Sequence, residues 1–155
     1  MITLQFSRVG GPETWAIAAF ERGWCSHVDA VLPDGSLLGA RCDAIGGQPP
    51  GVRIRPAGYE AWTRVEIVHL PATAEVEAAF WSFLHDQVGT PYDELAIAGF
   101  AFDRDWRNPA AWFCSELIAR ALEVSRWLPA LLSCAVNEIT PRDLELLVSP
   151  WGLAA

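Results

Sequence analysis

Three histidines and four cysteines are the side chains in this sequence best suited to nucleophilic chemistry. The cysteines are at positions 25, 42, 114 and 134, and the histidines are at positions 27, 69 and 85. A histidine that takes the proton from a cysteine thiol creates a thiolate, which attacks acyl carbon atoms. No histidine follows Cys114, so a pair that includes Cys114 must have its histidine earlier in the chain.

Cys114 lies where a polar segment meets a segment with helical apolar spacing. Its neighbours predict a helix over residues 115–125 with a buried stripe made by Leu117, Ile118, Ala121 and Leu122. The free N–H groups and the dipole of a helix N-terminus stabilise a thiolate and can hold an oxyanion. Asn108-Pro109 would also suit a helix start. A helix that began there would place Cys114 more than one turn inside and weaken this effect.

His27 belongs to an apolar segment, 26–32, that predicts a strand. Alternation along a strand places Cys25 and Asp29 on the same face as His27. Cys25 is therefore a rival nucleophile, although neighbouring side chains of one strand run parallel and rarely align for proton transfer. A structural role for His27 in the core or at a strand edge is the alternative, and Cys25, His27 and Cys114 together are a candidate zinc site.

The other two histidines have structural interpretations. His69 ends an alternating segment just before Pro71, which indicates a strand end. His85 falls in the last turn of a predicted helix, where an imidazolium meets the negative end of the helix dipole.

The elements expected around these residues form an α+β fold, a small antiparallel sheet with helices packed on one side. Strands are expected at 2–6, 26–32, 37–40, 52–55 and 64–70, whereas 15–20 is ambiguous between strand and helix. Asp34-Gly35 between two apolar runs predicts a hairpin. Helices are expected after an N-cap at Thr73, over 115–125, and after Thr140-Pro141. Residues 43–51 and 103–108 are expected to be loops. The length predicts a single domain spanning 1–155.

Composition excludes several classes of protein. A hydrophobic content of 52% rules out intrinsic disorder, and a formal charge of −8 argues against nucleic acid as a partner. The cysteine spacing contains no CxxC pair, so a zinc ribbon is excluded, and free thiols are expected in a chain without a visible secretory signal. No secretory signal is visible, and the longest apolar stretch, 127–136, is too short to span a membrane. A cytoplasmic location is therefore expected.

Five short segments together resemble a known superfamily. Gly89–Tyr92 followed by Phe113–Leu117 is similar to the paired motifs of the NlpC-type papain-like cysteine hydrolases. Ser26–Val28, a hairpin and Leu38–Ala40 precede them, which is the order of the circularly permuted YiiX/YaeF-like branch, related to lecithin:retinol acyltransferase-like enzymes. Ile139–Leu144 resembles the closing segment of that branch.

The resemblance covers about residues 24 to 146 and implies a permuted papain-like fold with no cofactor. It implies that Cys114 is the nucleophile, that His27 is the general base, and that Tyr92 helps the Cys114 N–H to stabilise an oxyanion. The family's third polar group, which orients the histidine, falls here at Gly39-Ala40, where no side chain can do so. Replacements are a backbone carbonyl, a water, or one of four side chains: Asp29, Asp43, Gln48 and Glu66.

Three functions follow from this resemblance. The first is hydrolysis of an amide or peptide bond, as in cell-wall peptides, through an acyl-thioester. The second is lipid acyl hydrolysis or acyl transfer, in which the aromatic-rich segment 96–102 would line a lipid cleft rather than belong to an ordinary core. The third is a non-catalytic papain-like binding module of a phage particle or secretion apparatus, which the missing third group favours. The chain is of bacterial or phage type under this interpretation, and its oligomeric state is open.

Overall fold

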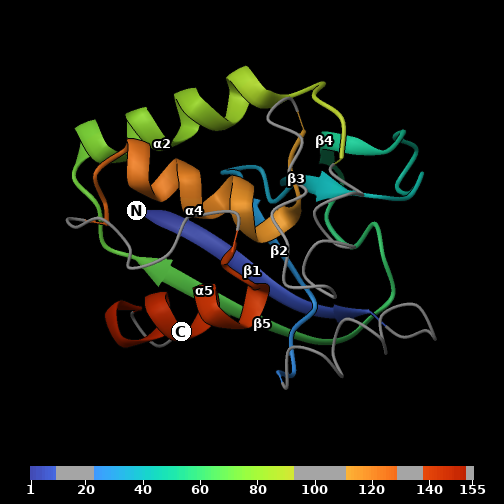
Figure 1. The fold of residues 1–155 in the computed structure, drawn as a ribbon, viewed down its shortest axis with the longest axis horizontal. Helices are drawn as coiled ribbons and strands as arrows, with labels where there is room; N and C mark the ends of the chain where they lie inside the picture. The colour runs from blue at the N-terminus through green and yellow to red at the C-terminus, as the bar shows by residue number, and fades with distance from the viewer. Residues whose placement is uncertain (10–22, 93–110, 129–137, 153–155) are drawn as a thin grey trace.

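The computed structural model describes residues 1–9, 23–92, 111–128 and 138–152. Five strands form one antiparallel sheet in the order β4-β3-β2-β1-β5 (Figure 1). They are β1 (Ile2–Val9), β2 (His27–Val31), β3 (Leu37–Arg41), β4 (Gly51–Arg55) and β5 (Trp62–Leu70). The described helices are α2 (Ala74–Gln87), α4 (Cys114–Val124), α5 (Pro141–Val148) and the short 3₁₀ helix η2 (Ser149–Trp151). The predicted α+β class is confirmed.

The predicted hairpin joins β2 to β3. Gly35 has φ +83°, a conformation that favours glycine. Asp34 Oδ1 accepts hydrogen bonds from the Ser36 backbone N–H at 2.9 Å and from its hydroxyl at 2.6 Å. This turn sets the register in which Ala30 faces Leu38 and Val31 faces Leu37.

Side-chain caps begin two of the helices at the predicted residues. The Thr73 hydroxyl accepts from the Val76 N–H at the start of α2. At the start of α5, Thr140 and Asp143 form a reciprocal capping box, and Pro141 follows the N-cap Thr140. Local sequence therefore specifies where these helices start. The expectations for 15–20, 96–102 and 103–108 lie outside the described residues.

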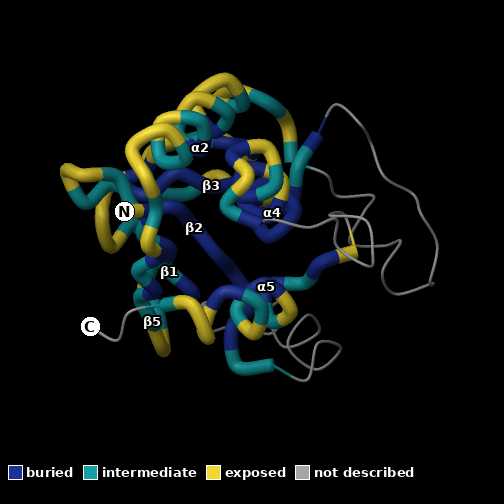
Figure 2. Tube along the Cα trace, turned by 90° about the vertical axis from the view of Figure 1, so that its left-hand side faces the viewer, coloured by how far each residue is buried: buried dark blue, intermediate teal, exposed yellow. Residues whose placement is uncertain are grey.

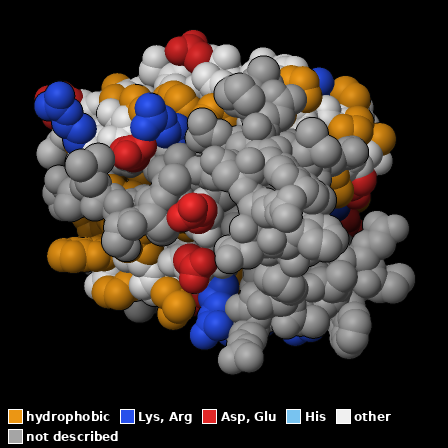
Figure 3. Space-filling view, in the orientation of Figure 1, with side chains coloured by type: hydrophobic (Ala, Val, Ile, Leu, Met, Phe, Trp, Pro, Cys, Tyr) orange, Lys and Arg blue, Asp and Glu red, His pale blue; other side chains and the backbone are white. Residues whose placement is uncertain are grey.

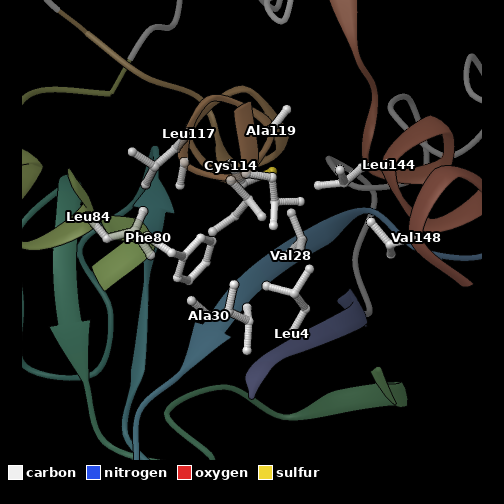
Figure 4. Close-up of a cluster of buried hydrophobic side chains, with 14 of the residues drawn as sticks. Leu4, Val28, Ala30, Phe80, Leu84, Cys114, Leu117, Ala119, Leu144 and Val148 are labelled. Carbon is white, nitrogen blue, oxygen red and sulfur yellow. The ribbon is translucent and has the colours of Figure 1, made fainter. Parts of the chain in front are cut away.

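All three longer helices contribute side chains to one core. Alternation along the strands turns Leu4, Val28 and Ala30 toward the helices, and Phe80, Cys114 and Leu144 meet them from α2, α4 and α5 (Figure 4). The tube in Figure 2 is buried along the inner strands and along α4, whereas the outer turns of α2 are exposed. The helix α4 thus lies at the centre of the molecule, against β2 and β3.

The connection from β4 to β5 crosses the sheet. These two strands are its opposite edges, and Arg55 at the end of β4 pairs with Leu37, whereas Trp62 at the start of β5 pairs with Val9. Residues 56–61 must therefore pass from one edge and end of the sheet to the other. A turn begins the crossing, closed by a bond from the Tyr59 N–H to the Pro56 carbonyl, with Gly58 at φ +66°.

The surface carries mixed charge. On the face drawn in Figure 3, the described basic side chains stand apart from one another among acidic and hydrophobic ones. Within the described part of the chain, no helix combines the length and the apolar character that crossing a membrane requires.

Candidate active site

The helix α4 begins at Cys114 itself. Its N-cap, Phe113, is extended, with φ −104° and ψ 170°, and no side chain caps the first turn. Trp112 forms an isolated bridge with Tyr92, so the chain before Cys114 is not helical. A helix that ran unbroken into Cys114 from further upstream is therefore excluded, because it would include Trp112. Cys114 lies in the first turn, where the backbone N–H groups have no partner within the helix.

The structure brings His27 and Cys114 together. His27 is the first residue of β2, and α4 packs on β2 and β3. The Cys114 side chain lies close enough to the His27 ring to help raise the pKa of the imidazole. Both side chains are almost fully enclosed, with 6% of His27 and 5% of Cys114 exposed. This pair of groups has the composition of a cysteine–histidine dyad.

Asp29 contacts the imidazole at Nε2. Its Oδ1 atom is 3.0 Å from His27 Nε2, and its side chain is buried. The carboxylate occupies the space over Gly39 on the neighbouring strand, where an added Cβ atom would lie 1.9 Å from Oδ1. Asp29 and Gly39 are therefore interdependent: the residue that lacks a side chain makes room for the carboxylate that contacts the histidine.

The other three candidates for the third group have different surroundings. Asp43 Oδ1 accepts from Arg41 Nε at 2.7 Å, and Gln48 closes a turn through its backbone bonds to Ile45. Glu66 is on the edge strand β5, where its half-exposed carboxylate lies 3.4 Å from Arg64. Of the four candidates, Asp29 is the one that the structure places in contact with His27.

Two aromatic residues that the sequence analysis did not identify contact the His27 ring, and one of them also contacts Asp29. The Tyr59 hydroxyl lies 3.1 Å from His27 Nε2 and donates to Asp29 Oδ2 at 2.9 Å. The Trp62 ring stacks on the imidazole, with centroids 5.8 Å apart and planes at 10°. Tyr59 lies in the 56–61 crossing and Trp62 is the first residue of β5, so no local pattern around His27 could have revealed them. The only signal was that Tyr59 is one of two tyrosines in the chain.

The titration of these groups reflects their burial and their mutual contacts. Burial lowers the pKa of His27, but the nearby Asp29 carboxylate and Cys114 outweigh it and raise that pKa to about 9. For Asp29, burial favours the neutral form, yet His27 and the Tyr59 hydroxyl hold its pKa below the usual range. Burial and the Asp29 charge raise the pKa of Tyr59, which therefore stays a neutral hydroxyl. At neutral pH the site holds an imidazolium beside a carboxylate.

Tyr92 is held close to the start of α4. Its bridge to Trp112 and the bond from the Trp112 N–H to the Pro91 carbonyl place it beside the segment that leads into Cys114. The preceding residues are fixed to β4, because the Val52 N–H donates to the Thr90 carbonyl at 2.9 Å. The segment that contains Tyr92 thus lies between β4 and the start of the helix that carries Cys114.

Cys25 has a different environment from the one predicted. It precedes β2, which begins at His27, so strand alternation does not place it on the His27 face. Its buried thiol donates to Glu145 Oε2 at 3.4 Å, and Trp24 donates to the other oxygen of the same carboxylate. Among the residues that the structure describes, no three metal-binding side chains gather in a cluster that could hold an ion. The zinc interpretation of Cys25, His27 and Cys114 therefore has no geometric support there.

The remaining histidines lie elsewhere. His69 Nδ1 is 3.1 Å from the Thr3 hydroxyl, on the paired strands β5 and β1. His85 is in the last turn of α2, as predicted, and its carbonyl accepts from the Val88 N–H. Among the described residues, His27 is thus the histidine that lies beside a cysteine.

Comparisons of this chain with models of protein families, with curated proteins and with solved structures found no match.

Proposed function

We propose that the protein is a thiol-dependent acyl hydrolase in which Cys114 is the nucleophile, His27 the general base and Asp29 the group that orients His27. The observation that carries this proposal is the order of contacts, from Asp29 to His27 to Cys114 at a helix N-terminus. An imidazole between a carboxylate and a thiol can accept the thiol proton and later return it.

The reaction proceeds in two steps. In the first, the Cys114 sulfur forms a bond to the acyl carbon, and the leaving amine or alcohol departs with the proton carried by His27. In the second, His27 takes a proton from water, whose oxygen attacks the thioester and releases the acid. The sulfur leaves the acyl carbon, and His27 keeps the proton taken from water as the imidazolium with which the cycle began. The N–H groups of the first turn of α4 stabilise the oxyanion of both steps, with Tyr92 as a second donor.

A circularly permuted papain-like arrangement is part of this proposal. It is supported by a histidine strand that precedes the cysteine helix, by Cys114 as the first helical residue, and by the Tyr92 segment beside it. The binding-module alternative drew on the apparent lack of a third polar group. Asp29 beside His27 removes that reason.

Amide or peptide bonds are the proposed substrates, in line with the resemblance to cell-wall hydrolases. The lipid alternative depended on residues 96–102, which lie outside the described residues. A panel containing a peptide anilide, a phospholipid and an activated ester separates these substrates. Hydrolysis of the anilide is the expected result, with an acyl group found on the Cys114 peptide and removed by hydroxylamine.

Alkylation by iodoacetamide tests the dyad without knowledge of the substrate. Rates are measured for each cysteine peptide by mass spectrometry at pH 7, and the exposed Cys42 serves as an internal reference thiol. We expect Cys114 to react roughly tenfold faster than Cys42 despite its burial, because the imidazolium stabilises its thiolate.

The matched variant is His27→Gln, which keeps a polar side chain of similar size. It should lower the alkylation rate of Cys114 at least to that of Cys42 and leave Cys42 unchanged. Equal rates at Cys114 in the wild type and the variant, neither faster than Cys42, would refute the proposed dyad.

A further inference from the structure

A single tyrosine hydroxyl bridges the two groups that flank the proposed nucleophile. Tyr59 donates its only hydroxyl proton to Asp29 Oδ2, so its oxygen acts as an acceptor toward His27 Nε2. Nε2 must then carry a hydrogen. Because Asp29 and Tyr59 both contact Nε2, Nδ1 is the nitrogen left to accept the proton of Cys114.

Asp29 does not fix the imidazole ring by itself. It is on the same strand as His27, two residues further on, and side chains so placed run parallel. Its Oδ1 atom is 3.0 Å from Nε2 but forms no hydrogen bond, so the two groups make a close ion pair. An ion pair without an aligned hydrogen bond restrains the direction of the ring weakly. The Tyr59 oxygen is the hydrogen-bond acceptor for this N–H, and its proton fixes the other carboxylate oxygen.

Tyr59 is itself held in place from several sides. The edge of its ring meets Trp62 with centroids 5.2 Å apart and planes at 81°. The guanidinium groups of Arg41 and Arg55 lie 5.6 and 5.5 Å from its ring centroid. The turn at Gly58 directs the chain into this position. A Phe side chain at position 59 would keep the ring contacts and would lose only the hydroxyl.

We propose that Tyr59 is a positioning residue, which keeps the hydrogen of neutral His27 on Nε2 and directs Nδ1 at Cys114. The purpose of this arrangement depends on the proposed function. The tautomer of His27, in contrast, can be measured without any activity.

The experiment compares wild type, Tyr59→Phe and a control. Protein labelled with ¹⁵N in its histidines is examined by NMR at pH 10, above the His27 pKa of about 9, where the neutral ring reveals its tautomer. His27→Gln assigns the signal among the three histidines. The control is Thr3→Val, which removes a hydroxyl bonded to a different histidine, His69, in the same sheet.

In wild type we expect a single tautomer with hydrogen on Nε2. Tyr59→Phe should produce a mixture of both tautomers and slow the alkylation of Cys114 roughly tenfold, the effect of one hydrogen bond. Thr3→Val should change neither. The proposal is overturned if Tyr59→Phe retains the wild-type tautomer. Failure of the proposed function is a separate result, namely a wild-type Cys114 that is no more reactive than Cys42.

Discussion

The carboxylate of Asp29 fills the space that a side chain at Gly39 would need. An added Cβ would lie 1.9 Å from Oδ1, far inside van der Waals contact. Gly39 follows Leu38, whose partner across β2 and β3 is Ala30, so Asp29 and Gly39 meet on adjacent strands. In the family that the sequence resembles, the neighbouring strand supplies the group that orients the histidine. Here the histidine's own strand supplies a carboxylate, and the neighbouring strand supplies the room for it.

This relationship predicts that Gly39→Ala acts through Asp29. The new methyl group should displace the carboxylate from His27 and slow Cys114 alkylation about as much as Asp29→Ala does, roughly tenfold or more. The double variant Asp29→Ala/Gly39→Ala should be no slower than either single variant, because the methyl group then fills space already emptied. If the double variant instead slowed alkylation by the product of the two single effects, Gly39 would act independently of Asp29. Alkylation rates of the four proteins provide the measurement.

The raised pKa of His27 predicts how stability depends on pH. Since the folded pKa of about 9 exceeds the ordinary value of 6.5, the contribution of the protonated ring is complete below pH 6.5 and is lost as the pH rises through 9. Relative to His27→Gln, the free energy of unfolding should fall by about 3 kcal/mol across this window. Urea denaturation of both proteins at pH 6, 8 and 10 measures the difference. A difference that is constant with pH would contradict the ion pair with Asp29.

A buried hydroxyl next to the nucleophile predicts a local effect on stability. Ser115 Oγ donates to the Ile139 carbonyl at 2.7 Å and joins the first turn of α4 to the segment that leads into α5. Ser115→Ala should cost about 1 to 3 kcal/mol, because it leaves a buried carbonyl without its donor. The matched control is Ser82→Ala, at an exposed position of α2, where we expect a change within about 0.5 kcal/mol. Thermal unfolding of the two variants compares them, and equal shifts would show that the Ser115 bond adds no stability.

The parts of this molecule that sequence could predict are those specified by neighbouring residues. Asp34-Gly35 makes its hairpin, and Thr73 and Thr140 begin their helices, because each signal acts over a few residues. Asp29 was a candidate for the same reason, since alternation alone places it beside His27. The choice among the four candidates required the packing over Gly39.

Tyr59 and Trp62 could not be predicted in this way. Their contacts with His27 depend on the sheet order, in which β4 and β5 are opposite edges. The alternation that predicted these strands says nothing about which strands are neighbours. The helix start at Cys114 was also ambiguous, because Asn108-Pro109 offered a second local signal, and only the structure shows that α4 begins at Cys114.

The crossing from β4 to β5 also has a consequence for how the protein is made. The first strand, β1, lies between β2 and β5 in the sheet, and its partner β5 is synthesised some sixty residues later. Until β5 has docked, Trp62 does not stack on His27, and Tyr59 lacks its ring contact with Trp62. Such distant pairing is slow relative to hairpin formation. During synthesis, the β2–β3 hairpin can therefore form while its histidine is still exposed to water, and the histidine acquires its enclosed environment only when the fifth strand joins.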